Sequence, residues 1–271
     1  MQEKSTSMRY NHREGIEIRN GRSEMQKRFS IILFLVVSLL IVNCSFCFAV
    51  RPLYTEDARV TPKSVLKLEC GLLLLSNRDN TGAKELSTSF KYGFGKDLDL
   101  TAEIPYLSKY SDEDNYDGLA NGTVKFKYNF YNAYTEFASF QIGYLPGNPS
   151  LNITTHSDIN TMLIYSSLLD DLSYNLNFGY TFDGDRSGAP LEDFIIYNVS
   201  IAKPMNDSIN LMGEMQYSRD TLIDFIVGEF AIGLNYKLND QCMLDAALGC
   251  GLNENSSSLN FVVGFTHVVS L

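Results

Sequence analysis

The residues Leu172–Phe182, LSYNLNFGYTF, alternate between large apolar side chains and small or polar ones without a break. Successive side chains of a β-strand point to opposite faces, so this alternation predicts a strand with one apolar and one polar face. A strand that is apolar along one whole side needs an apolar environment over its full length. The apolar row consists of Leu172, Tyr174, Leu176, Phe178, Tyr180 and Phe182.

The same period of two recurs along the chain from residue 65 to the C-terminus. Each alternating segment has about the 9–11 residues that a tilted strand needs to cross a bilayer. Short links alternate with longer ones, as periplasmic turns and outer loops do in bacterial barrels. The predicted fold class is therefore all-β, a transmembrane antiparallel β-barrel of about 12 strands. The predicted strands are residues 65–77, 84–94, 98–106, 119–130, 135–144, 157–167, 172–182, 192–202, 208–218, 224–237, 242–252 and 257–270.

The strands are expected to close into a ring, because no water is present in hydrocarbon to satisfy the backbone groups of a free edge. Twelve tilted strands make a backbone cylinder roughly 24 Å across, which leaves room for a lumen. A soluble β-sandwich would also show alternation, but it buries its apolar faces in one core of limited size. Here almost every segment carries a full-length apolar row, which favours the barrel.

The N-terminal part of the chain has a different character. The only long apolar run, Phe29–Val42, has 14 residues and is shorter than the roughly 20 that a spanning helix needs. Lys27 and Arg28 precede the run, and the small residue Ala49 follows it, which is the pattern of a secretory signal peptide. We therefore divide the chain into an overextended N-terminal segment (1–24), a signal peptide (25–49) and an outer-membrane barrel (50–271).

Charge and cysteine content exclude several classes of function. Residues 1–49 hold 7 of the 22 Lys and Arg and 4 of the 32 Asp and Glu, so the rest has a net charge near −13. Such a surface does not favour nucleic acid, whose phosphates require basic side chains. The mature cysteines Cys70, Cys242 and Cys250 are odd in number and lack metal-site spacing. We predict no disulfide framework, no metal site and no cofactor.

Ten charged side chains fall on the strand faces opposite the apolar rows. A charge that faces lipid at the bilayer midplane costs about 2–4 kcal/mol, so these residues are expected to line the lumen. They could form a polar path for solute, or pair across neighbouring strands and fill the lumen, and the cost of unpaired confined charges favours pairing. The predicted lumen-lining residues are Lys67, Glu69, Lys91, Asp99, Glu103, Lys125, Lys127, Glu214, Glu229 and Asp245.

The start of the mature chain resembles a known bacterial family. Arg51–Ala58 (RPLYTEDA), followed by Leu66–Gly71 (LKLECG), is similar to the opening of the outer-membrane transporter family named for the MetA pathway of phenol degradation. That opening reads Arg-Pro-x-x-Thr-Asp-Asp-Ala, then Leu-Glu-x-Gly in the first strand. This chain has Glu56 where the family usually has Asp, and Cys70 at the variable position.

A second, weaker match is Gly184–Gly188 (GDRSG), followed by Asp193, Phe194 and Tyr197 on the next strand. Together the two matches and the strands between them cover most of residues 50–271. The resemblance implies an outer-membrane barrel that transports small, often aromatic or hydrophobic compounds. The family name does not establish phenol as the solute of this chain.

The predicted function is the passive passage or binding of small solutes, since no nucleotide motif or energy-coupling domain is visible. A plugged structural or adhesive barrel is the alternative. We predict no enzymatic activity and no catalytic residues, because the one candidate, His156 beside Ser157, lacks the geometry that triad members reach through the fold. The expected location is the outer membrane of a Gram-negative bacterium. The expected partners are outer-membrane lipid, lipopolysaccharide, the barrel-assembly machinery and a small-molecule solute, but not nucleic acid.

Overall fold

The computed structural model describes residues 54–78, 81–110, 115–147, 157–182, 184, 193–221 and 225–271. The predicted signal peptide, the segment before it and His156 lie outside the described residues. Within the described ranges, no helix has the length and apolar character needed to cross a membrane.

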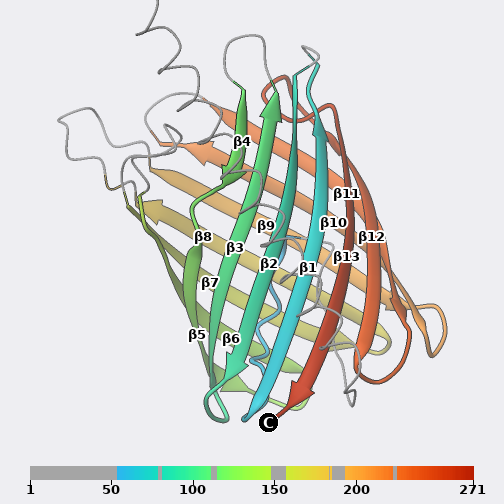
Figure 1. Ribbon diagram of the computed structural model, residues 1–271. Helices are drawn as coiled ribbons and strands as arrows, with labels where there is room; N and C mark the ends of the chain where they lie inside the picture. Colours follow the sequence, from blue (N-terminus) through green and yellow to red (C-terminus); the bar gives the residue numbers. More distant parts are fainter. Residues whose placement is uncertain are drawn as a thin grey trace, which may run out of the picture. The chain divides into compact units, whose positions relative to one another are not determined.

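The described part of the chain forms antiparallel strands joined by turns and loops (Figure 1). Their bounds are β1 Val65–Ser76, β2 Gly82–Gly93, β3 Leu98–Tyr110, β4 Tyr116–Leu119, β5 Thr123–Asn132, β6 Glu136–Leu145, β7 Asp158–Leu169, β8 Leu172–Phe182, β9 Phe194–Pro204, β10 Ile209–Asp220, β11 Ile226–Lys237, β12 Cys242–Gly251 and β13 Leu259–Ser270.

The sheet closes on itself. β1 pairs with β2 on one side and with β13 on the other, and the pairings then run without a gap through β3, β5 and every later strand. Figure 1 shows β13 and β1 side by side, with the C-terminus next to the start of β1. All neighbouring strands are antiparallel, so the predicted 12-stranded barrel is confirmed, with β4 as an additional short strand.

The fourth predicted strand, residues 119–130, corresponds to β5, which begins four residues later. Leu119 instead ends the short strand β4, and β4 and β5 pair with different parts of β3. The predicted loop 107–118 is partly strand as well. The break between β4 and β5 lies opposite Pro105, whose nitrogen has no hydrogen to donate to a neighbouring strand. The Pro105 carbonyl accepts a hydrogen bond from the backbone N–H of Ala120 at 2.9 Å.

The barrel is polar inside and apolar outside, the reverse of a soluble domain. Among the described residues, 28 polar or charged residues are buried against 9 apolar ones. The side chain of Phe126 is 48% exposed, whereas that of its neighbour Lys127 is 2% exposed, as the period of two requires. Other apolar residues exposed on the outer face include Leu176, Phe178, Ile232 and Phe261.

The two ends of the barrel differ in their connections. The short-turn end carries the links after β2, β5, β7, β9 and β11. The long-loop end carries the others, except the β4–β5 link, which lies within the wall beside β3. The short turns after β9 and β11 are stabilised in the same way. The side-chain oxygens of Asn206 and Asn239 each accept hydrogen bonds from two backbone N–H groups at 2.9 Å. The tight β7–β8 turn places Asp170 at a φ of 53°, a left-handed conformation that Asp tolerates.

Cys70, Cys242 and Cys250, the three described cysteines, are not bridged to one another. Cys70 lies on β1 and Cys242 on β12, and β13 lies between these two strands. Cys242 and Cys250 lie toward opposite ends of the same strand, too far apart for the Cα separation of a disulfide.

Candidate functional site

The lumen contains a part of the chain itself. Residues Tyr54–Thr61, here called the luminal segment, precede β1 and hydrogen-bond to side chains on the inner face of the barrel. An extended segment without strand partners must satisfy its backbone groups in another way. Polar side chains of the barrel wall supply those bonds, reaching in from β10, β8, β7, β6, β5 and β3.

The first anchor of the luminal segment is Glu214 on β10. Its carboxylate accepts the backbone N–H of Tyr54 at 3.1 Å and that of Thr55 at 2.5 Å. The hydroxyl of Thr55 and the side-chain amide of Gln216 donate to the same carboxylate. Glu214 is 2% exposed, so four donors converge on a buried charge that would otherwise be costly.

The middle of the luminal segment is held by neutral side chains. Asn177 accepts the backbone N–H of Glu56 at 2.6 Å and donates to the Glu56 carbonyl at 2.9 Å. The backbone N–H of Ala58 donates to the hydroxyl of Ser166 at 2.8 Å. The Ala58 carbonyl accepts from Asn129 and from the hydroxyl of Ser139. The backbone groups of Glu56 and Ala58 therefore have hydrogen-bond partners on β5, β6, β7 and β8, and these bonds fix the path of the segment across the lumen.

Ion pairs attach the luminal segment to a third region of the wall. The carboxylate of Glu56 lies 3.6 Å from the ammonium of Lys91 on β2 and 3.5 Å from that of Lys127 on β5. Lys127 also donates to the carbonyl of Asp57 at 2.8 Å. At the end of the segment, the backbone N–H of Thr61 donates to Asp99 on β3 at 2.8 Å.

Asp57 and Arg59 form an ion pair within the luminal segment. The guanidinium of Arg59 donates to both carboxylate oxygens of Asp57, and it also lies 5.9 Å from the centre of the Phe137 ring. Burial acts to raise the pKa of Asp57, but the hydrogen bonds and charge of Arg59, with a smaller contribution from Lys127, bring that pKa below its ordinary value.

Asp57 should therefore make the seating of the luminal segment sensitive to acid. A carboxyl group with a lowered pKa in the folded state stabilises that state above its ordinary pKa of about 3.9, and the contribution is lost as the pH falls through the lowered value. We expect Asp57→Asn to weaken seating at neutral pH by about 1 kcal/mol, because Arg59 is half exposed. The variant should also lack this component of the acid transition. Membrane conductance recorded as the pH is lowered measures both effects, and superimposable wild-type and variant curves would contradict the assignment.

The luminal segment joins the barrel through a tight turn at the short-turn end. Ser64 adopts a φ of 60°, its N–H donates to the carbonyl of Gly93 at 3.0 Å, and its carbonyl accepts from Leu271 at 2.8 Å. A Cβ atom at position 93 would lie 2.1 Å from the carbonyl oxygen of Pro62. Glycine is therefore required at position 93 for the chain to pass from the lumen into β1.

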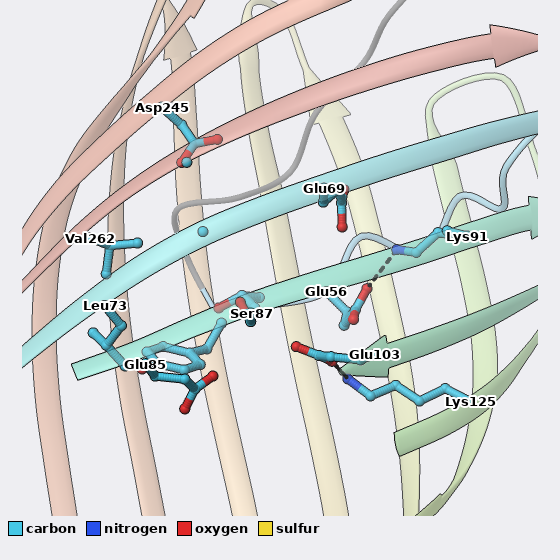
Figure 2. A pocket seen from close by; sticks show the side chains of 14 residues that line it. Glu56, Glu69, Leu73, Glu85, Ser87, Lys91, Glu103, Lys125, Asp245 and Val262 are labelled. Carbon is cyan, nitrogen blue, oxygen red and sulfur yellow. Dashed lines mark hydrogen bonds and ion pairs between the residues drawn. The ribbon is translucent and has the colours of Figure 1, made fainter. Parts of the chain in front are cut away.

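The luminal segment lies between two cavities, which share Thr55, Glu56 and Lys91 in their walls. The cavity toward the long-loop end has a volume of about 150 Å³ and is here called the outer chamber. Figure 2 shows Glu56 and Lys91 in contact there, with Glu103 paired to Lys125. The cavity toward the short-turn end, here called the inner chamber, has a volume of about 720 Å³. The lumen is thus divided rather than empty or completely filled.

Most of the predicted lumen-lining residues meet at these chambers. Glu69, Lys91, Glu103, Lys125 and Asp245 line the outer chamber, and Lys67, Lys91 and Lys127 line the inner one. Asp99 and Glu214 hold the luminal segment. Glu229 lies apart from both chambers and accepts from Ser257 at 2.6 Å and Asn260 at 3.2 Å.

The expected pairing between charges on neighbouring strands holds only in part. Lys125 pairs with Glu103 at 3.2 Å, and Lys67 pairs with Glu69 on its own strand at 3.5 Å. Lys127 lies opposite Asp99 in the strand register, but it contacts Glu56 and Asp57 of the luminal segment instead. The charged side chains of the wall therefore interact with the luminal segment as well as with one another.

Comparisons with known proteins identify the fold. No family model and no curated protein matches the chain. Among solved structures, the fold is similar to an outer membrane channel from Pseudomonas putida F1, with a TM-score of 0.63 and 11% identity over 82% of this chain and 100% of that chain. It is also similar to the KdgM porin, with a TM-score of 0.55 and 13% identity over 74% of this chain and 98% of that chain. These likenesses show a β-barrel of the outer-membrane type.

Proposed function

We propose that this chain is a bacterial outer-membrane barrel that passes or binds small solutes passively, with the luminal segment as the element that restricts passage. The single observation that carries the proposal is a closed barrel whose lumen holds two chambers divided by one short, non-covalently attached segment. A barrel built only as a scaffold has no need of a lumen of this size.

Two further observations support passage. The inner face is polar and the outer face apolar, as in barrels with a water-filled interior. The solved proteins of similar fold include an outer membrane channel and a porin. The orientation that follows has the short-turn end, with both ends of the barrel chain, in the periplasm.

The finer assignment is a solute of hydrophobic or aromatic character. It is supported by the resemblance of the chain's opening to the phenol-pathway transporter family, because residues 54–58 of that opening form the start of the luminal segment. It is also supported by apolar side chains that line the inner chamber, among them Met212 and Met243.

A plugged barrel without transport is the second candidate, and one observation favours it. The backbone N–H groups of Tyr54, Thr55, Glu56, Ala58 and Thr61 all donate to side chains of the barrel wall, which makes the luminal segment a well-fixed closure. The two candidates share the fold and differ in whether the seated segment leaves a path.

Single-channel recording in planar bilayers separates these functions. Wild-type protein should give small ohmic openings, and a variant lacking residues 54–61 should give larger ones. A silent wild type with an open deletion variant would favour the plugged barrel. Silence of both, with membrane insertion verified by heat modifiability, would reject passage through the lumen.

A further inference from the structure

The inner chamber has the size and character of a small-molecule site. Its volume of about 720 Å³ falls in the range of about 300–1,000 Å³ found for ligand pockets. One side of it is apolar, formed by two small clusters on adjoining strands. The apolar side chains of this wall are Val65, Ala202, Met212, Met243 and Val268.

Polar side chains, Asn210 and Asn235 among them, interrupt this apolar wall. Asn235 on β11 lines the inner chamber, is 4% exposed, and its side-chain oxygen accepts no hydrogen bond from any described residue. In the strand register it lies opposite Asn210 on β10 and Asp245 on β12. Met212 lies two residues beyond Asn210, and Met243 two residues before Asp245. The acceptor therefore has a methionine on each side along the barrel wall.

Charges around the inner chamber do not favour an ionic ligand. Lys67 is paired with Glu69 and Arg59 with Asp57, and Lys91 and Lys127 are both paired with Glu56, so each basic group already has an acidic partner. An ion entering the chamber would lose its hydration and gain little from these pairs. An uncharged ligand avoids that cost.

We infer that the inner chamber binds an uncharged apolar molecule that carries one hydrogen-bond donor, a hydroxyl or an amine N–H, and that Asn235 is the residue that selects for this donor. The inference rests on the proposed function, because it names the solute class for the same lumen. The apolar body displaces water from the methionine wall, and the flexible methionines adapt to its shape. The donor gives the buried amide oxygen a partner that a purely apolar ligand cannot provide.

The test uses a matched pair of probes, 1-naphthalenemethanol and its methyl ether, which share a ring system but differ in the donor. Binding is measured as the saturable excess of probe that sediments with protein-containing vesicles over empty ones. Wild-type protein should bind the alcohol with saturation. Asn235→Leu should weaken alcohol binding roughly 3–10-fold, the effect of one net hydrogen bond, and leave binding of the ether unchanged or tighter.

Asn198→Leu is the matched control. Asn198 is also buried on the inner face, its side-chain oxygen has no described partner, and it is not part of the inner chamber wall, so alcohol binding should not change. Met212→Ala should weaken both probes by a similar factor, because it removes apolar contact alone. Equal responses of alcohol and ether to Asn235→Leu, or no saturable binding by a heat-modifiable wild-type protein, would overturn the inference. Neither result bears on passage, which the conductance of wild type and the deletion variant decides separately.

Discussion

Replacing Glu214 with alanine should increase the single-channel conductance several-fold, toward that of a variant without residues 54–61. Three donors of the luminal segment, on Tyr54 and Thr55, bind this carboxylate, and hydrogen bonds to charged groups contribute about 1.5–3 kcal/mol each. In the variant, water accepts some of the hydrogen bonds that the carboxylate accepted. A net loss of about 3 kcal/mol still shifts the seated-to-released equilibrium roughly 160-fold. Conductance in planar bilayers and protease cleavage within residues 54–61 both measure the release.

The control is Glu229→Ala, which removes another inner-face carboxylate, one that accepts hydrogen bonds from Ser257 and Asn260 rather than from the luminal segment. It should leave the conductance near that of wild type. Glu214→Gln should fall between wild type and alanine, since it keeps an acceptor oxygen but loses the charge. If Glu214→Ala conducts like wild type and its luminal segment resists protease, Glu214 does not hold the segment in place.

Deleting Phe265–Leu271 should abolish membrane insertion. These residues carry half of the pairing that closes the ring, including Val65 with Ser270 and Cys70 with Phe265, and they also pair with the start of β12. Without them, the backbone groups of β1 face lipid without partners, at a cost of several kcal/mol each. The truncated protein should collect in the periplasm or be degraded, as followed by fractionation and heat-modifiable migration on gels.

The matched control removes Leu271 alone. This residue lies after β13, its side chain is 73% exposed, and its N–H donates to the Ser64 carbonyl. Its loss should leave insertion intact and cost at most about 1 kcal/mol. A membrane-embedded, heat-modifiable protein without Phe265–Leu271 would mean that β1 closes the ring with another strand.

The sequence predicted the barrel and its faces because both depend on local pattern. In a strand, each residue's face follows from its neighbours, so the outward Phe126 and the inward Lys127 could be assigned without knowing any partner. The same pattern predicted all twelve strands within a few residues. It did not predict β4 as a separate strand, because the interruption opposite Pro105 depends on the pairing of β3 rather than on the sequence of residues 119–130.

The luminal segment could not be predicted from periodicity. Residues 54–61 show no alternation, and their partners Glu214 and Asn177 are more than 100 residues away in sequence. Periodicity gives a side chain's face but says nothing of what else occupies the lumen, so the ion pair between Lys127 and Glu56 could not be predicted. The one available signal was the acidic pair Glu56 and Asp57 in a segment placed before a barrel with inward lysines.

The distance in sequence between the luminal segment and its anchors has a kinetic consequence for folding. Thr55 and Glu214 are separated by 159 residues, so their contact requires β10 to be formed and in place. Contacts of such long range carry a large loop-closure entropy and form late. Barrel closure should therefore precede docking of the luminal segment, and refolding into vesicles should show two phases. Heat-modifiable migration would report the first, and protection of residues 54–61 from protease the second. Glu214→Ala should remove the second phase and leave the rate of the first unchanged.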